Sequence, residues 1–581
     1  NQQIATVVPV DAITGHYDTL QDAISAPIIV GQIITTTGYH TVNDGGAGQY
    51  IVVVGGTGVD DGGSYLDMVN GNQLELIVTD SVNINQYGAI SDGVTNDATS
   101  LIDGLLAGNA VDINKSSKIE LTSSQAVIFL EKIDSINFNT PTTINILSGI
   151  VNLDKRILMS SNTLRNLTIK GVDDGSYNIT SISQSGSAKN HSIILNISDT
   201  SKFTVGSFAL ISDATGTGYP DALRGCWEVL SKTSSTVTIK STINNVWPVM
   251  TITSATVWPM NTIFRWVTGV VGLAITGTLH TLSNVILDGS WDITTGTNED
   301  GAFDGLQVGS SPNTPETGLN ESEQANVGSA YFARVGIVKW ESNATQVLGK
   351  LYGVLLSTCS CGWRGLQAAR NGFIGAKGSS ASGNGASGYE SEEGGYILAQ
   401  NSVAIGNWQQ GYFAIGGGGI SCGSSFALLN VTHGLEAKNF SAITTDGVVS
   451  ELNDIFGVTT TAGQILIGSN AVVDNNTSTD IVAAEGGLIN ANGALTIGDV
   501  SIDEESNSLY IKPDGAVDLP FSKILENSNN GKLRFDISSI GDLNFGFDPS
   551  NTGSYTARLR MKNSGVLHPT NDGVGALGRT S

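Results

Sequence analysis

The fold is decided by a repeat of 23 residues, of which Gly388–Gln410 (GYESEEGGYILAQNSVAIGNWQQ) and Gly411–His433 (GYFAIGGGGISCGSSFALLNVTH) are two copies. The residues that open the copies keep this step: Gly365, Gly388, Gly411, Gly434, Gly457 and Asp480. Nine residues after each start comes an aliphatic: Ile374, Ile397, Ile420, Ile443, Leu466 and Ile489. Nineteen residues after each start comes an amide or acid: Asn384, Asn407, Asn430, Asn453, Asn476 and Asp499. Since several positions of one period agree in every copy, the repeat reflects structure.

A repeat of this length, with glycine at its corners and one aliphatic at a fixed position, is typical of stacked β-coils. We predict that each coil contributes three short strands to three parallel sheets, with the aliphatic column in the interior. The asparagines are expected to bond backbone groups of their own coil and to bond one another from coil to coil. A leucine-rich repeat has a similar length, but it requires an L-x-x-L-x-L pattern that the chain lacks.

The composition also indicates an all-β chain. It contains 72 glycines among 581 residues, and 28 basic against 53 acidic side chains give a net charge of −25. That balance argues against a nucleic-acid-binding protein, which needs clustered Lys and Arg. The apolar content of 40% is enough for a large core, and no apolar stretch is long enough to span a membrane. The cysteines lack zinc-site spacing, so we expect buried free thiols and neither metal nor cofactor.

Outside the repeat, the pattern becomes less regular. Lys202–Met260 contains FTVGSFALISD, CWEVLSK and STVTIKS, which predict a compact β insertion. Beyond Lys512, the stretches GKLRFDISSIGDLNFGFDP and YTARLRMK predict antiparallel hairpins. Helix is expected only in short pieces such as Ala98–Leu106.

The segment Ser81–Asp103 (SVNINQYGAISDGVTNDATSLID) resembles the one that opens the β-helix in pectate-lyase-like bacteriophage tailspikes. It has an apolar strand, Tyr87-Gly88-Ala89, the tract DGVTND and a short helix that would close the solenoid, with Asp97 as its N-cap. Upstream, GYH at 38–40 and DGGAGQY at 44–50 are similar to the neck that precedes this segment in tailspikes. The tract around Leu567-His568-Pro569 resembles the one before a removable chaperone in tail fibres. The whole arrangement resembles capsule depolymerases of Acinetobacter phages.

The resemblance implies a right-handed parallel β-helix that assembles as a homotrimer. Exposed Trp and Phe on an acidic solenoid would also need partners to cover them. The domains would be an N-terminal neck or cap (1–80), the β-helix with its insertion around 202–260 (81–511), and a C-terminal β-sandwich-like domain for trimerisation or carbohydrate binding (512–581). Such a protein acts in the virion tail at the host surface, joined to the tail or baseplate through a segment before Asn1. Its expected ligand is a capsular polysaccharide or exopolysaccharide.

The outward side of the repeat supplies the first catalytic candidates. Because strand side chains alternate, positions one and three after each start face inward, and positions two and four face solvent. Glu390 and Glu436 hold position two in copies two coils apart, so their separation would be roughly 9–10 Å. That is near the ~6.5–9.5 Å that leaves room for a water in inverting glycoside hydrolysis. Phe413 lies between them and could stack on a sugar ring.

Other residues compete for the same roles. The further catalytic candidates are Asp288, Asp304 and Glu341, and the further substrate-binding candidates are Glu392, Lys438, Trp340 and Arg370. For the arginines and lysines, structural ion pairs are an equally good explanation. A solvated acidic face without catalysis is the alternative for Glu390 and Glu436.

The sequence therefore predicts endo-glycosidic hydrolysis of a bacterial polysaccharide by two carboxylates and water. A polysaccharide lyase is the second possibility, with a base such as His433, Lys438 or Tyr331 near a cation that stabilises the substrate carboxylate. The third is a tail fibre that adheres to the polysaccharide without cleaving it.

Overall fold

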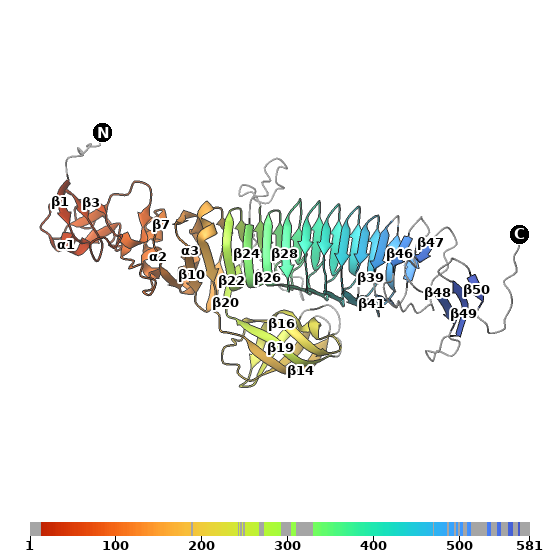
Figure 1. The fold of residues 1–581 in the computed structure, drawn as a ribbon. Coiled ribbons are helices and arrows are strands. Elements are labelled where there is room, and N and C mark those ends of the chain that lie inside the picture. The colour runs from red at the N-terminus through yellow and green to blue at the C-terminus, as the bar shows by residue number, and fades with distance from the viewer. Residues whose placement is uncertain are drawn as a thin grey trace.

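The computed structural model describes residues 13–187, 190–241, 243, 247, 250–266, 272–291, 304–309, 329–468, 470–484, 487–492, 495–497 and 500–502, and the strands 508–512, 532–535, 543–547, 556–561 and 567–569. The chain is a long right-handed parallel β-solenoid with a small sheet at its N-terminal end and a barrel on its flank (Figure 1). The prediction of an all-β parallel solenoid is confirmed.

The first sheet of the solenoid is a parallel ladder of 11 strands. Its members are β12 (Ile157–Met159), β21 (Leu273–Ile275), β23 (Leu306–Val308), β25 (Thr345–Val347), β27 (Leu366–Ala368), β30 (Tyr389–Glu392), β33 (Tyr412–Ile415), β36 (His433–Lys438), β39 (Phe456–Thr461), β42 (Thr479–Ala484) and β45 (Val500–Ile502).

The second and third sheets share three long strands, β22 (Thr278–Asp288), β24 (Ser329–Val338) and β26 (Lys350–Cys359). Each bends from one sheet into the next at a residue with left-handed backbone, namely Asn284, Arg334 or Leu355. The second sheet adds β8 (Lys118–Leu121), β10 (Thr142–Ile146), β13 (Leu167–Lys170), β28 (Phe373–Lys377), β31 (Tyr396–Leu398), β34 (Gly419–Ser421), β37 (Ala442–Thr445), β40 (Gln464–Ile467), β43 (Leu488–Asn492), β46 (Ser508–Lys512) and β47 (Lys532–Phe535). The third adds β11 (Gly149–Leu153), β20 (Thr262–Trp266), β29 (Ser380–Ser382), β32 (Val403–Ile405), β35 (Phe426–Leu428), β38 (Val449–Glu451), β41 (Ala471–Asp474) and β44 (Leu495–Ile497).

The solenoid interior follows the predicted columns, with one shift. Ile374, Ile397, Ile420 and Ile443 are buried, and the rings of Tyr389 and Tyr412 stack inside at 4.8 Å. In the next coil, however, Ile465 and not Leu466 pairs with Ile443 and fills the core. The turn before it is one residue shorter, so the prediction of Leu466 as a core residue is wrong. Asp499, the expected last member of the asparagine series, lies outside the described residues.

The asparagine column forms a ladder along one corner. The side-chain amide of each Asn donates to the side-chain oxygen of the Asn one coil further, at 3.0, 3.0, 2.9 and 2.8 Å from Asn384 to Asn476. Each of these oxygens also accepts the backbone N–H of the preceding Asn, as Asn430 does from Asn407 at 3.2 Å. The amide of Asn430 donates in addition to the carbonyl of Ala404 at 3.3 Å. The coil-to-coil bonds are as predicted. The amides of Asn407, Asn430 and Asn453 donate to backbone carbonyls of the preceding coil, whereas Asn476 also donates to the carbonyl of Asp474 in its own coil at 3.1 Å, as predicted.

Replacing Asn430 by Ala should lower the free energy of unfolding by about 1–3 kcal/mol, because buried N–H and C=O groups in two coils lose their partners. The measurement is chemical or thermal unfolding followed by circular dichroism. Asn152→Ala is the matched control, since Asn152 is exposed on β11, and it should change stability by less than about 0.5 kcal/mol. Equal stabilities of the two variants would show that the ladder does not stabilise the solenoid.

The N-terminal end is closed by a five-stranded sheet and by helices. The sheet has the order β1-β2-β3-β5-β4, with β1 (Ile13–Tyr17), β2 (Ile33–Thr36), β3 (Gln49–Val53), β4 (Tyr65–Asp67), β5 (Gln73–Leu76) and the short helix α1 (Leu20–Ser25). Three parallel strands and two helices follow: β6 (Val82–Asn83), β7 (Val111–Ile113), β9 (Ile136–Phe138), α2 (Ala98–Leu106) and α3 (Ser123–Glu131). Helix α2 spans the predicted residues and buries Leu101 and Leu105. Asp97 precedes it but makes no capping bond, because its carboxylate accepts the N–H groups of Ile90 and Ser91.

The insertion is a closed antiparallel barrel that begins earlier than the predicted residue 202. Its strands are β14 (Tyr177–Ser187), β15 (Asn190–Ile197), β16 (Phe208–Thr217), β17 (Gly225–Lys232), β18 (Thr236–Ser241) and β19 (Thr251–Met260). The barrel lies against the flank of the solenoid (Figure 1). Its Cys226 and Trp227 share one buried cluster with Val338 and Val403 of the third sheet, so the two parts are packed together.

At the C-terminal end, one predicted hairpin strand belongs to the solenoid. Lys532–Phe535 was expected in an antiparallel hairpin, but it pairs in parallel with β46 as β47. The strands β48 (Leu543–Phe547), β49 (Thr556–Met561) and β50 (Leu567–Pro569) form the antiparallel sheet. All four cysteines are buried and free, as predicted. In the described residues, no helix has the length and apolarity needed to cross a membrane.

Candidate active site

Glu390 and Glu436 lie on the outward side of the first sheet. Strand register places Glu390 beside Phe413 and Phe413 beside Glu436, so the carboxylates are two coils apart, as predicted. Inward neighbours fix this orientation, since Tyr389 and Leu435 are fully buried in the interior and side chains alternate along a strand.

These carboxylates are not exposed, which corrects the expectation that position two faces solvent. Glu390 is 3% exposed and Glu436 is 2% exposed. The side chains that contact them include residues that directly precede an opening glycine: Arg364 contacts Glu390, and Gln410 and His433 contact Glu436. These outward side chains lie over the sheet and remove the carboxylates from water.

Glu390 is held by a charged neighbour from the preceding coil. The Nε of Arg364 lies 2.7 Å from its Oε1, and a second guanidinium nitrogen lies 3.8 Å from Glu392. Gln367 donates to Glu392 at 2.6 Å. Burial raises the pKa of Glu390 above its ordinary value, and the positive charge of Arg364 offsets part of that rise. Compared with a free glutamate, a larger fraction of Glu390 is therefore protonated at a given pH.

Glu436 has a different set of partners. The ammonium of Lys438 lies 2.6 Å from its Oε1, His433 lies 3.9 Å away, and Gln410 donates to its Oε2. Burial lowers the pKa of His433, which favours a neutral imidazole, and its ring stacks on Phe456 at 4.9 Å.

Hydrogen bonds extend from Glu436 to Ser387, which lies three residues before Glu390. The amide of Gln410 donates to Glu436, and the hydroxyl of Ser387 donates to the Oε1 of Gln410 at 3.0 Å. Phe413 is half-buried between the two carboxylates, with the ammonium of Lys438 5.7 Å from the centre of its ring. This arrangement of Glu390, Phe413 and Glu436, which we call the carboxylate face, places one carboxyl group beside a guanidinium and the other beside an ammonium.

The remaining carboxylate candidates lie elsewhere. Asp288 is 1% exposed, forms an ion pair with Arg265 at 2.8 Å and accepts the N–H of Ser290. Asp304 accepts the N–H of Asn343 at 3.0 Å and an amide N–H of Gln307. Glu341 is half-buried at a corner of the solenoid.

Two predicted substrate-binding residues also differ from expectation. Trp340 is fully buried in the solenoid and donates to the carbonyl of Leu287 at 3.1 Å, so its ring is inaccessible to a sugar. Arg370 lies at a corner and pairs with Glu393 at 3.0 Å, apart from the carboxylate face. Tyr331, a candidate lyase base, is exposed on the second sheet.

The sequence interpretation missed Ser387, Gln367 and Gln410. The sequence contains a pattern that could have identified two of them. Ser387 and Gln410 each directly precede an opening glycine, and this position repeats every 23 residues like the other columns of the repeat. No group of three or more His, Cys, Asp or Glu suited to a metal ion occurs among the residues with described positions.

Comparison with known proteins gives matches to solved structures alone. No protein-family profile and no curated protein matches the chain. Most of the solved structures are phage tailspikes, including those of Acinetobacter phages. The enzymatically active domain of tailspike protein 2 from bacteriophage CBA120 is 12% identical, with 83% of this chain and 57% of that chain covered and a TM-score of 0.26. The present chain thus spans little more than half of that protein.

Two further matching structures are an epimerase module and a second phage tailspike. The A-module of the mannuronan C-5 epimerase AlgE4 from Azotobacter vinelandii is 12% identical, with 79% and 98% coverage and a TM-score of 0.32. The tailspike gp49 of the Acinetobacter baumannii bacteriophage Fri1, a capsular polysaccharide depolymerase, is 11% identical, with 87% and 75% coverage and a TM-score of 0.22. At these values the likenesses carry no argument about the chemistry of this chain.

Proposed function

We propose that this protein is a phage tailspike that binds a bacterial capsular polysaccharide or exopolysaccharide and cleaves it by endo-glycosidic hydrolysis. The observation that carries the proposal is the carboxylate face, where Glu390 and Glu436 lie two coils apart in different electrostatic surroundings. A solvated acidic surface would leave such carboxylates exposed, whereas Glu390 and Glu436 are buried and each is paired with a cationic side chain.

In the proposed reaction, Glu390 acts as the general acid. Its raised pKa favours the protonated form that must donate to the leaving glycosidic oxygen. Glu436, which pairs with Lys438, accepts a proton from the attacking water. Adjacent coils are about 4.8 Å apart, so two coils leave roughly the separation that accommodates a water in an inverting enzyme. Phe413, between the two carboxylates, would stack on the apolar face of a sugar.

A lyase is the second candidate, and one observation favours it. His433 lies next to Glu436 and Lys438, and its lowered pKa provides the neutral imidazole that a general base requires. In β-elimination that imidazole would remove a proton from a uronic acid unit, and Lys438 would stabilise the substrate carboxylate.

The products of capsule digestion distinguish these functions. Hydrolysis should lower the viscosity and release oligosaccharides with new reducing ends. Elimination should release products that carry the ultraviolet absorbance of an unsaturated uronate. Binding of the polysaccharide without any released fragment would contradict both enzymatic proposals and leave adhesion.

The pH dependence tests the assignment of Glu390. Because the general acid must be protonated, kcat/KM should fall as the pH rises through the raised pKa of Glu390. Arg364→Met removes the charge that lowers this pKa, so the alkaline limb should move to higher pH, and Arg364→Lys should move it less. An alkaline limb at the same pH in all three proteins would contradict the role of Glu390.

We also propose that the protein is a homotrimer carried on the virion tail. The exposed aromatic side chains Tyr331, Tyr352 and Tyr396, with half-buried Phe373 between them, support assembly because they form an apolar stripe on the second sheet. Sedimentation should give about three times the chain mass of 60.3 kDa, and a monomer would contradict the assembly.

A further inference from the structure

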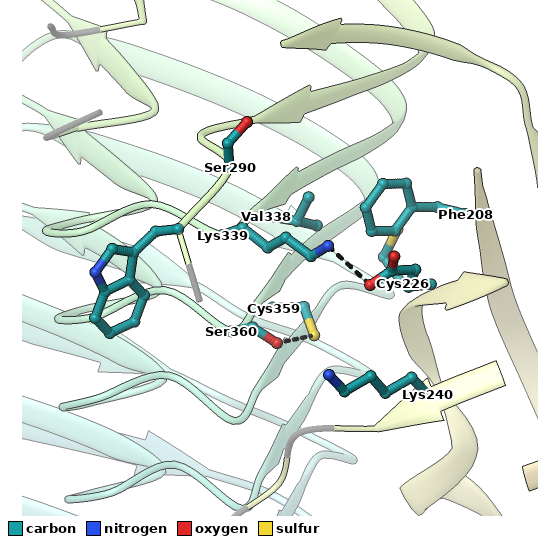
Figure 2. A pocket seen from close by; sticks show the side chains of 10 residues that line it. Phe208, Cys226, Lys240, Ser290, Val338, Lys339, Cys359 and Ser360 are labelled. Atoms are coloured by element: carbon teal, nitrogen blue, oxygen red, sulfur yellow. Dashed lines mark hydrogen bonds and ion pairs between the residues drawn. The ribbon is translucent and has the colours of Figure 1, made fainter. Parts of the chain in front are cut away.

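A cavity of about 270 Å³ lies where the inserted barrel meets the solenoid (Figure 2). Lys240 reaches it from β18 of the barrel, and Lys339 reaches it from the end of β24 in the solenoid. The remaining lining residues are Phe208, Cys226, Glu228, Ser290, Trp291, Val338, Cys359 and Ser360. The lining therefore mixes apolar side chains with polar and charged groups, which could orient a polar ligand.

The charge of this cavity is opposite to that of the protein. Lys339 is neutralised by Glu228 at 2.7 Å and lies 5.6 Å from the centre of the Phe208 ring. Lys240 lies opposite the same Glu228 in the ladder between β17 and β18, so the described lining has two ammonium groups facing one carboxylate and is net positive. In a chain with 28 basic and 53 acidic residues, such a cavity favours an anionic ligand.

Trp291 connects the cavity with the corner that leads to the carboxylate face. Its N–H donates to the carbonyl of Lys339 at 2.7 Å, and its ring lies over Gly362, where an added Cβ would be 3.0 Å from the ring. Trp363, which follows Gly362 in the chain, is 47% exposed. The guanidinium of Arg364 lies 5.7 Å from the centre of the Trp363 ring. Arg364 is also the partner of Glu390, so these contacts run without interruption from the cavity to the carboxylate.

We propose that the cavity is a binding subsite for an acidic sugar unit, of the uronic acid class, in the polysaccharide that the carboxylate face cleaves. The ammonium of Lys240 would bind the sugar carboxylate through charge-assisted hydrogen bonds. Trp291 offers an aromatic surface for the ring of the same unit or of its neighbour. The identity of the ligand as part of a polymer rests on the proposed function, whereas the binding of an acidic sugar can be tested without catalysis.

The test is a ligand-observed NMR titration of the full chain with sodium glucuronate, and with glucose as the neutral probe. Glucuronate should bind more tightly than glucose by at least about tenfold, as expected for hydrogen bonds that involve a charge. Lys240→Met should remove that preference, and Lys240→Arg should keep most of it. Trp291→Ala should weaken the binding of glucuronate by roughly two- to tenfold.

Lys350→Met is the matched control, because Lys350 is exposed at the start of β26, whereas the cavity lies near the end of that strand at Cys359. It removes the same charge and should leave the titration unchanged. Equal binding of glucuronate and glucose, or equal losses in Lys240→Met and Lys350→Met, would overturn the subsite. Because the titration does not depend on cleavage, a failed subsite leaves the hydrolase proposal standing. Conversely, glucuronate binding in a protein that releases no oligosaccharide would refute the hydrolase alone.

Discussion

Glu390→Gln and Glu436→Gln should each reduce the rate of polysaccharide cleavage by a factor of about 10²–10⁴. A glutamine at 390 cannot donate the proton that the leaving oxygen needs, and one at 436 cannot accept a proton from water. The amide has nearly the size of the carboxyl group and still accepts hydrogen bonds from Arg364 or Lys438. The measurement is the initial rate of reducing-end release from purified capsule.

The controls separate chemistry from folding and binding. Both variants should keep the melting temperature and polysaccharide affinity of the parent, and Glu393→Gln should keep full activity because Glu393 is exposed and pairs with Arg370. Phe413→Ala should chiefly weaken binding, by about 1 kcal/mol. If both glutamine variants cleave capsule at the parental rate, the carboxylate face is inert and Asp304 and Glu341 become the next candidates.

Ile420→Asp should prevent folding of the solenoid, because it places a charge without a partner in the interior. Ile420 is 1% exposed and lies between Ile397 and Ile443 of the neighbouring coils. Burying an unpaired carboxylate costs several kcal/mol, which is a large part of the stability of an ordinary domain. The expected result is loss of soluble protein or a strong fall in melting temperature.

The adjacent residue provides the control for this substitution. Ser421 is half-buried on the outward side of the same strand, so Ser421→Asp should fold and melt close to the parent. An Ile420→Asp variant that melts like Ser421→Asp would contradict the assignment of inward and outward positions.

The sequence was sufficient for the solenoid, since its period and alternation determine which side chains face inward. It predicted Ile420 in the interior, the coil-to-coil bonds of Asn430, and the helix at Ala98–Leu106. The 23-residue period predicted the wrong core residue next to Ile465, where the preceding turn is one residue shorter. A turn that is shorter by one residue shifts the inward and outward positions of the strand that follows it. The start of the barrel at Tyr177 was missed for a related reason: its strands pair with one another and carry no trace of the 23-residue period.

The candidate site was predicted only in part. The positions of Glu390, Phe413 and Glu436 follow from strand register, which alternation gives directly. Their burial does not follow, because it depends on how far Arg364 and Gln410 extend over the sheet. Side-chain conformation of this kind is set by contacts between coils and has no periodic signal of its own.

Because the coils stack at a constant distance, side chains on the surface of the solenoid recur at regular intervals along its axis. Each coil adds about 4.8 Å along the axis, so two side chains at the same position of different coils are separated by a whole number of these steps. If one 23-residue coil were inserted or removed between Trp291 and Glu436, the distance between these two residues along the axis would change by one step. The surroundings of each residue would stay the same. A protein built in this way can be adjusted to polymers of different repeat length by counting coils, without redesigning either end.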